Sequence, residues 1–485
     1  MKSLRGPAGL VVAGFALSRV VYYAAGVRFD ATPLRSFIQY VDPELLRHDL
    51  LESIWHLHTQ PPLFNLLLGI VLKASGDAYD EVLNVIFVLA GLLLALGLYR
   101  LMVRLGVRPW PASALAVLFS ASPPAVLYEN WLYMDHFVAL ALVWAAVFVH
   151  RFVNSGRGGD ALVAFGLLGA VVLSRTLFHL LFLVAAIALV ALLQPGRRRT
   201  VAVAAALPVV LCLAVYVKTL VQFDTFGATT CSGINVARLT THRVDPARRA
   251  ELMRAGELSQ FALTIPGDLP FKRPELFERE PVRGHPILDD PVKSTGYVNF
   301  DHAAYLDICR DYMDDAITLL KREPREARNG VLAATLIYWR PAGQYYFFSR
   351  PAERSRSRVW GIERVHAIGL GQARRPRVSL EESVAPRGAA DKLLGVAWLV
   401  VAGYVLTAWW TARALLRERR SGTPRSPANV TCAFVVLTAA YVTLVGTFSE
   451  LGENNRFRYL VDPLVFAAFA ALAAEWLRQG RRRRR

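Results

Sequence analysis

Charged residues stand at the ends of long apolar runs in this chain. Asp30 follows the first run, Asp135 opens the fourth, Arg175 separates the fifth from the sixth, and the segment Glu453 to Arg458 precedes the last. Ionisable groups at a membrane boundary are costly to desolvate, so they usually serve a site or pair with each other. Carboxylates can take a proton from a hydroxyl group, and arginines can bind an anion such as a phosphate. For each residue alone a solvated helix end is the simpler interpretation, but four separate segments together indicate one site.

The apolar runs that position these residues are long enough to cross a membrane. Of the 485 residues 54% are hydrophobic, and the mean hydropathy is +0.33, a balance that is rare in a water-soluble globule. A helix needs about 20 residues to cross a bilayer. The pattern therefore predicts an all-α polytopic membrane protein with about ten spans, at 8–27, 82–103, 111–128, 136–153, 161–175, 177–193, 200–221, 392–412, 429–448 and 460–477.

The basic residues predict the orientation. Loops assigned to the cytoplasm contain many arginines but only three acidic residues, Asp160, Glu418 and Glu475, so they account for nearly all of the net charge of +18. Cytoplasmic loops of membrane proteins carry such an excess. We expect both termini in the cytoplasm of a cell with an inner membrane, no nucleic-acid partner, and a first apolar run that is retained as a span because it lacks a convincing small-residue cleavage site.

Two segments on the opposite face are too long to be simple connections. The first, 28–81, contains the run Leu63–Leu72, which is too short to cross and suits an interfacial or re-entrant helix. The second, 222–391, shows amphipathic helical patterns near 302–322 and 326–348 and predicts a small α-rich outer domain. The expected organisation is a membrane module over 1–221, the outer domain over 222–391 and a second membrane module over 392–485.

The cysteines and histidines of the outer segments leave alternatives open. Cys231 and Cys309 share the outer domain and can form a disulfide or stay free, because sequence does not report their separation. Histidines and acids between His48 and His58 invite a zinc interpretation, but His56 and His58 would point to different faces of a helix. We therefore expect no metal at the site, although a divalent metal is not excluded. The residues weighed for zinc are His48, Asp49, Glu52, His56 and His58.

Five short motifs, and the order in which they follow one another along the chain, resemble those of the GT-C superfamily of membrane glycosyltransferases. The most similar groups are the protein O-mannosyltransferases and the lipid A aminoarabinose transferases. Ala31 stands where these families have a second acid, and Thr59-Gln60 replace one aligned residue. The matching segments are Phe29-Asp30, His58 to Leu63, Tyr133-Met134-Asp135, Ser174-Arg175, and Arg458-Tyr459 with Pro463.

The resemblance implies transfer of a sugar from a polyprenyl-phosphate donor to an acceptor hydroxyl on the outer face, with inversion and without a required cofactor. Asp30 is the expected general base, with Asp135 second. Arginines neutralise a phosphate leaving group, and the remaining polar residues contact sugar or cap a helix. The expected phosphate-binding residues are Arg175, Arg456, Arg458 and Tyr459, and the expected substrate-binding residues are His58, Gln60, Glu453, Asn454 and Asn455.

Two other function classes would share part of this pattern. A transporter or flippase of lipid-linked sugars would use the same arginines, but transporters tend to bind near the bilayer midplane between internal repeats, and this sequence shows no repeat. A non-catalytic assembly protein would explain the outer domain but not the acidic and basic motifs. The acceptor, whether glycan, lipid or protein, is not indicated by the sequence.

Overall fold

The computed structural model describes residues 6–349, 354–373 and 393–483, and within them all regular structure is helical. Two isolated bridges, Asp30 with Trp131 and Val292 with Val298, are the β-type pairings in this part of the chain. The predicted all-α class is confirmed. The N-terminal helices are α1 (Pro7–Ala24), α2 (Pro33–Ser36), α3 (Pro43–His48), α4 (Leu50–His56), α5 (Pro62–Ser75), α6 (Tyr79–Arg104), α7 (Pro109–Ser120), α8 (Pro123–Glu129), α9 (Asp135–Ser155), α10 (Gly158–Val172), α11 (Leu180–Leu193) and α12 (Arg198–Phe223).

Prolines begin many of these helices, because a proline in the first turn lacks only an N–H that the helix would leave unpaired. Examples are Pro7, Pro62 and Pro109. At the other end of α9, Gly156 adopts a positive φ of 73° that favours glycine, and the helix stops there. The later helices are α13 (Ser232–Leu239), α14 (Pro246–Arg254), α15 (Leu269–Lys272), α16 (Glu275–Glu278), α17 (Pro286–Asp289), α18 (Ala304–Arg322), α19 (Pro324–Tyr338), α20 (Arg354–Gly369), α23 (Trp398–Arg420), α24 (Pro427–Ser449), α25 (Asn454–Tyr459) and α26 (Asp462–Arg483).

Helix α9 lies at the centre of the bundle. It packs against α6, α10, α24 and α26, while α12 lies against α10 and α11 on one side and α1 against α6 and α7 on another. The outward faces stay apolar: Leu207, Val210 and Val221 of α12 are all more than half exposed. Such a surface suits contact with lipid rather than water.

Among the described residues, six helical segments are long and apolar enough to cross a membrane, or seven if α7 and α8, bent by 60° at their junction, count as one span. This is fewer than the ten expected. The expected spans 161–175 and 177–193 correspond to α10 and α11, of 15 and 14 residues. At 1.5 Å per residue each is about 20 Å long, short of roughly 30 Å of hydrocarbon. The apolar run at 460–477 lies in α26, which is not among the six, so the number of spans stays a prediction.

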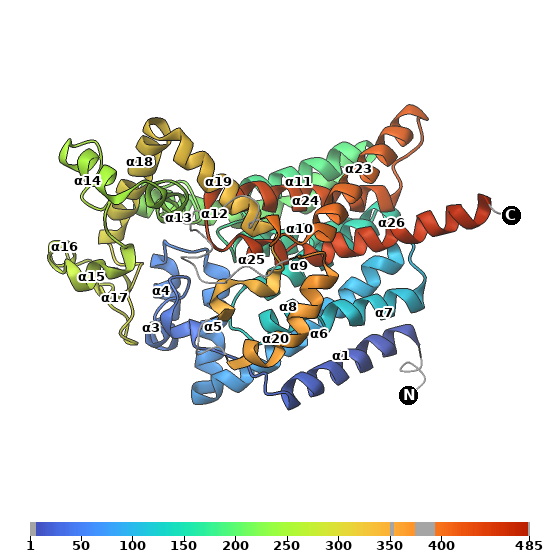
Figure 1. Cartoon of the computed structure of the whole chain (residues 1–485), viewed down its shortest axis with the longest axis horizontal. Helices are drawn as coiled ribbons and strands as arrows, with labels where there is room; N and C mark the ends of the chain where they lie inside the picture. The colour runs from blue at the N-terminus through green and yellow to red at the C-terminus, as the bar shows by residue number, and fades with distance from the viewer. Residues whose placement is uncertain (1–5, 350–353, 374–392, 484–485) are drawn as a thin grey trace.

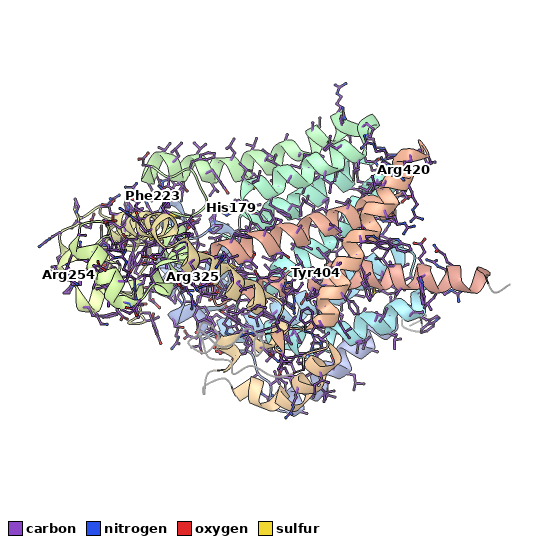
Figure 2. The ribbon with its side chains drawn as sticks, turned by 45° about the horizontal axis from the view of Figure 1, so that its top comes forward. His179, Phe223, Arg254, Arg325, Tyr404 and Arg420 are labelled. Carbon is purple, nitrogen blue, oxygen red and sulfur yellow. A yellow bond between two sulfur atoms is a disulfide. The ribbon has the colours of Figure 1, made fainter. Side chains whose placement is uncertain are left out.

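The molecule is elongated (Figure 1). Helices α14 to α17 form one end, whereas α1 begins and α26 ends near the other. Figure 2 shows the same division: Arg254 of α14 and Arg420 at the end of α23 lie at opposite ends. Which compartment each end faces stays a prediction.

The segment expected to form the outer domain contains a helical cluster with its own core, while its boundaries and its side of the membrane stay predictions. Phe261, Phe300 and Tyr305 pack around the disulfide between Cys231 and Cys309, whose Cα atoms are 5.0 Å apart. The two expected amphipathic helices are α18 and α19. Helix α19 ends at Tyr338 rather than near 348, because Pro341 cannot continue it. The expected boundary at 391 lies outside the described residues.

The first outer loop is itself helical. The run Leu63–Leu72, expected at the interface, forms α5, which packs against α3 and continues through a short turn into α6. Together α5 and α6 make up one candidate membrane span.

Candidate active site

A cavity of about 860 Å³ lies on the seam between the helix bundle and the outer domain. Its walls include the first outer loop, the break between α10 and α11, the junction of α24 and α25, and several segments of the outer domain. Two of the four segments expected from the sequence, those at Arg175 and at Glu453 to Arg458, contribute directly to the lining. Its polar wall includes Gln39, Gln60, Arg175, Asn235, Arg238, Glu450, Glu453 and Arg456.

Two arginines of this wall converge on one buried carboxylate. Asp135 opens α9 and is fully buried. Its Oδ1 lies 3.0 Å from Nη1 of Arg175, and its Oδ2 lies 3.5 Å from Nε of Arg456. Arg175 reaches this place because α10 ends at Val172 and α11 begins only at Leu180. Asp135 thus holds two cations from distant segments side by side.

Aromatic rings support the same two guanidinium groups. The Cζ atoms of Arg175 and Arg456 lie 5.3 Å and 4.4 Å from the ring centre of Tyr133. Arg456 also forms an ion pair with Glu453, which in turn accepts a hydrogen bond of 3.1 Å from the hydroxyl of Tyr345. Cation–π contacts and ion pairs of this kind fix the direction of an arginine.

Several donors of the pair are not used by hydrogen bonds within the described residues. Nε of Arg175, Nη1 of Arg456 and the hydroxyl of Tyr133 are buried without a hydrogen-bond partner there. Buried polar groups are nearly always satisfied. Because Arg175, Arg456 and Tyr133 line the cavity, an anion in it would find N–H donors already oriented.

Glu450 is a second carboxylate of the cavity wall, beside Glu453. It accepts a hydrogen bond of 2.8 Å from Nη1 of Arg238, which comes from α13 of the outer domain. Its backbone carbonyl accepts a hydrogen bond of 2.8 Å from Asn454. Burial raises the pKa of Glu450 from 4.5 to about 7. The group therefore changes its charge near neutral pH.

Of the residues expected from the sequence, Gln60, Arg175, Glu453 and Arg456 line the cavity. Asp135 lies behind them. Asp30 is half-buried and does not line the cavity. Its Oδ1 accepts a hydrogen bond of 2.9 Å from the backbone N–H of Thr32, and Thr32 does line the cavity.

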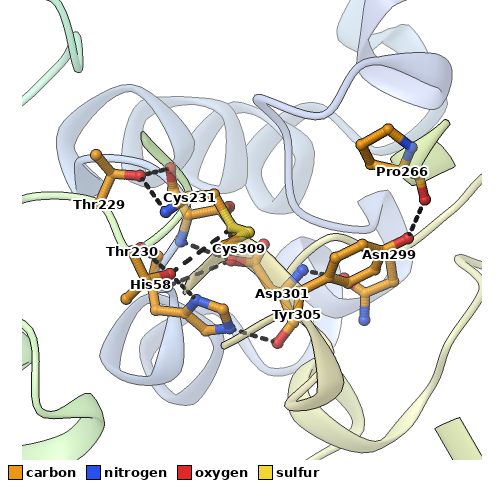
Figure 3. The surroundings of a disulfide bond; sticks show 10 residues. His58, Thr229, Thr230, Cys231, Pro266, Asn299, Asp301, Tyr305 and Cys309 are labelled. Carbon is orange, nitrogen blue, oxygen red and sulfur yellow. Dashed lines mark hydrogen bonds between the residues drawn. A yellow bond between two sulfur atoms is a disulfide. The ribbon is translucent and has the colours of Figure 1, made fainter. Parts of the chain in front are cut away.

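His58 joins the first outer loop to the outer domain instead of lining the cavity. Its ring nitrogens lie 2.7 Å from the hydroxyl of Thr230 and 2.9 Å from the carbonyl of Asp301 (Figure 3). The carboxylate of Asp301 also accepts hydrogen bonds from the backbone and hydroxyl of Thr59, at 3.0 Å and 2.7 Å. The loop that presents Gln60 is thereby tied to the outer domain.

The remaining expected residues hold the wall from behind. Arg458 turns away from the cavity and forms an ion pair of 3.0 Å with Asp462. Tyr459 donates to or accepts from Nδ1 of His136 at 3.0 Å. Asn454 donates to the carbonyls of Gly446 and Glu450, and Asn455 to that of Pro341.

Sequence reasoning missed Glu450, Arg238 and the aromatic pair Tyr133 and Tyr345. Glu450 lies three residues before the segment Glu453 to Arg458 that was singled out, just after the apolar run 429–448, and the same boundary argument could have included it. Arg238 belongs to a part of the chain without any recognisable motif, so no local signal pointed to it.

An apolar groove of about 620 Å³ runs beside the cavity, between α5, α9 and α10. Its lining is almost entirely hydrophobic and includes Leu67, Phe137 and Ala170, with Ser174 at one end. Ser174 is the immediate neighbour of Arg175, which lines the polar cavity. The linings of groove and cavity therefore adjoin in the chain at the break between α10 and α11.

Comparison with known families identifies part of the chain. Residues 59–221 match the sequence profile of the family described as dolichyl-phosphate-mannose-protein mannosyltransferase. The match includes three of the five motifs, those at Thr59 to Leu63, Tyr133 to Asp135 and Ser174-Arg175. Asp30 and the segment around Arg458 lie outside it. No curated protein sequence matches the chain significantly.

Two solved structures resemble the chain distantly. The oligosaccharyltransferase of Archaeoglobus fulgidus in its apo form shares 14% identity with a TM-score of 0.39, covering 96% of this chain and 50% of that one. The same enzyme tethered to an acceptor peptide gives 13% identity and a TM-score of 0.36, with 96% and 49% covered. The chain thus spans about half the length of the solved structures it matches. The resemblance seen in the motifs is confirmed over residues 59–221, where this chain is similar to the mannosyltransferase group of GT-C membrane glycosyltransferases.

Proposed function

We propose that this chain transfers a sugar from a polyprenyl-phosphate donor to an acceptor hydroxyl in the cavity, with inversion at the anomeric carbon. The observation that carries the proposal is the pair Arg175 and Arg456, held side by side by Asp135 with unused N–H donors at the cavity wall. Such donors can stabilise the charge that grows on a phosphate as the glycosidic bond breaks. Arginines suffice for this role, so the proposal requires no metal.

The adjoining groove supports a lipid donor. Its apolar lining suits an isoprenoid chain, and because Ser174 of this lining precedes Arg175 of the cavity, we propose that the head of that chain lies beside Arg175. A soluble nucleotide sugar would have no use for such a groove.

Asp30 remains the proposed general base. In the reaction the acceptor oxygen forms a bond to the anomeric carbon, the bond from that carbon to the phosphate oxygen breaks, and the acceptor proton passes to the carboxylate. Asp30 is half-buried and accepts a hydrogen bond from the backbone N–H of Thr32, a residue that lines the cavity. Glu450 lines the cavity but is paired with Arg238, and we propose that it orients a substrate hydroxyl.

The test is sugar transfer in proteoliposomes with a set of polyprenyl-phosphate sugars, using mass spectrometry to detect released polyprenyl phosphate. Loss of a general base costs about 100-fold or more in turnover, so Asp30→Asn should lose activity but keep donor binding. Glu450→Gln should lose about tenfold, the cost of one hydrogen bond of about 1.4 kcal/mol. A larger loss of activity in Glu450→Gln than in Asp30→Asn would indicate that Glu450, not Asp30, is the general base. Donor translocation without release, equal in all variants, would contradict the transferase and indicate a flippase.

A further inference from the structure

Three potential metal ligands meet on the far side of the first outer loop. Glu52 and His56 belong to α4, and His285 immediately precedes α17 of the outer domain. Among the described residues they form the one group of three whose ligand atoms all lie within 4.8 Å of one another. None of them lines the substrate cavity.

The geometry of the cluster follows from one helix and one anchored loop. Glu52 and His56 are four residues apart, so they lie on the same face of α4. Oε1 of Glu52 lies 2.5 Å from Nδ1 of His285, and the rings of His56 and His285 are stacked with centroids 3.9 Å apart. Two ligands from adjacent turns of a helix and a third from a distant segment are a common way to build a metal site.

The loop that carries His285 is held in place independently of a metal. The carboxylate of Asp289 accepts hydrogen bonds from the backbone N–H groups of Arg283, at 2.8 Å, and His285, at 2.9 Å. Fixed loops of this kind preorganise ligands. The side chains of Glu52 and His285 remain 49% and 32% exposed, so they can rotate to bring the ligand atoms to the spacing that metal bonds of about 2 Å require.

We propose that Glu52, His56 and His285 bind a zinc ion that clamps the first outer loop to the outer domain. Two imidazole nitrogens and one carboxylate oxygen suit zinc and disfavour magnesium, which prefers oxygen ligands. The other two histidines weighed for zinc in the sequence are not part of the cluster: His48 is exposed beside Glu44, and both ring nitrogens of His58 are engaged.

The clamp would act on the cavity from a distance. The first outer loop presents Gln60 to the cavity, and the outer domain supplies the opposite wall with Arg238 and Phe300. A metal bond between the two bodies would limit how far that seam opens.

Zinc titration of the purified full-length chain, after removal of metal with a chelator, tests the proposal. We expect one saturable site per chain, with the zinc affinity lowered about 100-fold in His56→Ala and in His285→Gln, which each remove one ligand. His48→Ala is the matched control, since it removes an exposed histidine from the neighbouring helix and should leave the affinity unchanged. Zinc should also raise the thermal midpoint of the intact chain but not that of His285→Gln.

Absence of saturable binding would overturn the proposal, as would equal zinc affinity in the intact chain and in both ligand variants. The thermal midpoint of each variant without metal shows that it is folded. A lower zinc affinity in His48→Ala of the same size as in His56→Ala would also contradict the assignment.

Discussion

Arg456 and Arg458 are two residues apart on α25, and both are almost completely buried. Their side chains nevertheless contact different groups. Arg456 faces the cavity with Asp135 and Glu453, whereas Arg458 faces Asp462 and the carbonyl of Tyr338. The two residues therefore form a natural pair of test and control.

Arg456→Lys should weaken donor binding about tenfold or more, because lysine keeps the charge but loses the planar fork that binds phosphate in two places. Arg458→Lys should leave donor affinity within about twofold and lower the thermal midpoint instead. Binding of a lipid-phosphate donor to both proteins in nanodiscs measures the difference. Equal losses would mean that the arginines act only through the fold of the wall.

Glu450 makes stability depend on pH. Its carboxyl group has a pKa of about 7 in the folded chain and about 4.5 when exposed. Between these values the unfolded chain has lost the proton that the folded chain keeps, so raising the pH through this window lowers the stability of the fold. Glu450→Gln removes the effect.

The thermal midpoint of Glu450→Gln relative to the unchanged chain should consequently rise from pH 5 to pH 8. At pH 5 both side chains are neutral, and at pH 8 only the glutamate bears a charge. Thermal unfolding in detergent at both values measures this. A difference that does not change with pH would show that burial does not perturb Glu450.

At the scale of elements, the interruption between α10 and α11 is the feature that unites groove and cavity. Both helices are too short to cross the hydrocarbon, and the seven residues from Leu173 to His179 carry the chain past Asp135. The sequence predicted two short adjoining runs separated by Ser174-Arg175, but not that an apolar groove ends at the same place. Grooves depend on how helices are spaced, which a single-chain hydrophobic pattern does not record.

Ala170→Phe fills the groove from α10 and should raise the KM for a long-chain donor about tenfold, by displacing part of the isoprenoid chain. A donor with a shortened, water-soluble chain should be affected little. Leu162→Phe is the control, because Leu162 lies on the same helix, is 41% exposed and does not line the groove. If both donors lost activity equally in Ala170→Phe, the groove would have no part in donor binding.

At the scale of the whole molecule, the helices and the arginine cluster were predictable and the seam was not. Long apolar runs specify helices because no other open structure satisfies the backbone in lipid, and charges at their ends gather at one boundary. The contact of Arg238 with Glu450 joins residues separated by 212 positions. The direction of Arg458 depends on how α25 is rotated against α19. Neither relation leaves a local pattern in the sequence.

Removing the disulfide should loosen the outer domain as a unit. Cys231→Ser with Cys309→Ser is expected to cost about 2 to 4 kcal/mol of stability, and it alters a residue that lines the cavity, Cys231. Unfolding of the double variant, compared with the unchanged chain under oxidising and reducing conditions, measures the effect. Cys212→Ala is the control, since Cys212 is buried and free. A reductant that left the unchanged chain as stable as before would contradict this role.

The meeting of groove and cavity at Ser174 and Arg175 has a consequence for how the two proposed substrates arrive. The lipid-linked donor diffuses in two dimensions within the bilayer and enters through the groove, while the acceptor approaches the cavity in three dimensions from the aqueous side. Saturation of the site by the donor then depends on the mole fraction of the donor in the surrounding lipid. Saturation by the acceptor depends on the molar concentration of the acceptor in water. Adding vesicle lipid at constant amounts of protein and donor lowers the mole fraction of the donor in the bilayer and should slow transfer, although the molar concentration of the acceptor has not changed.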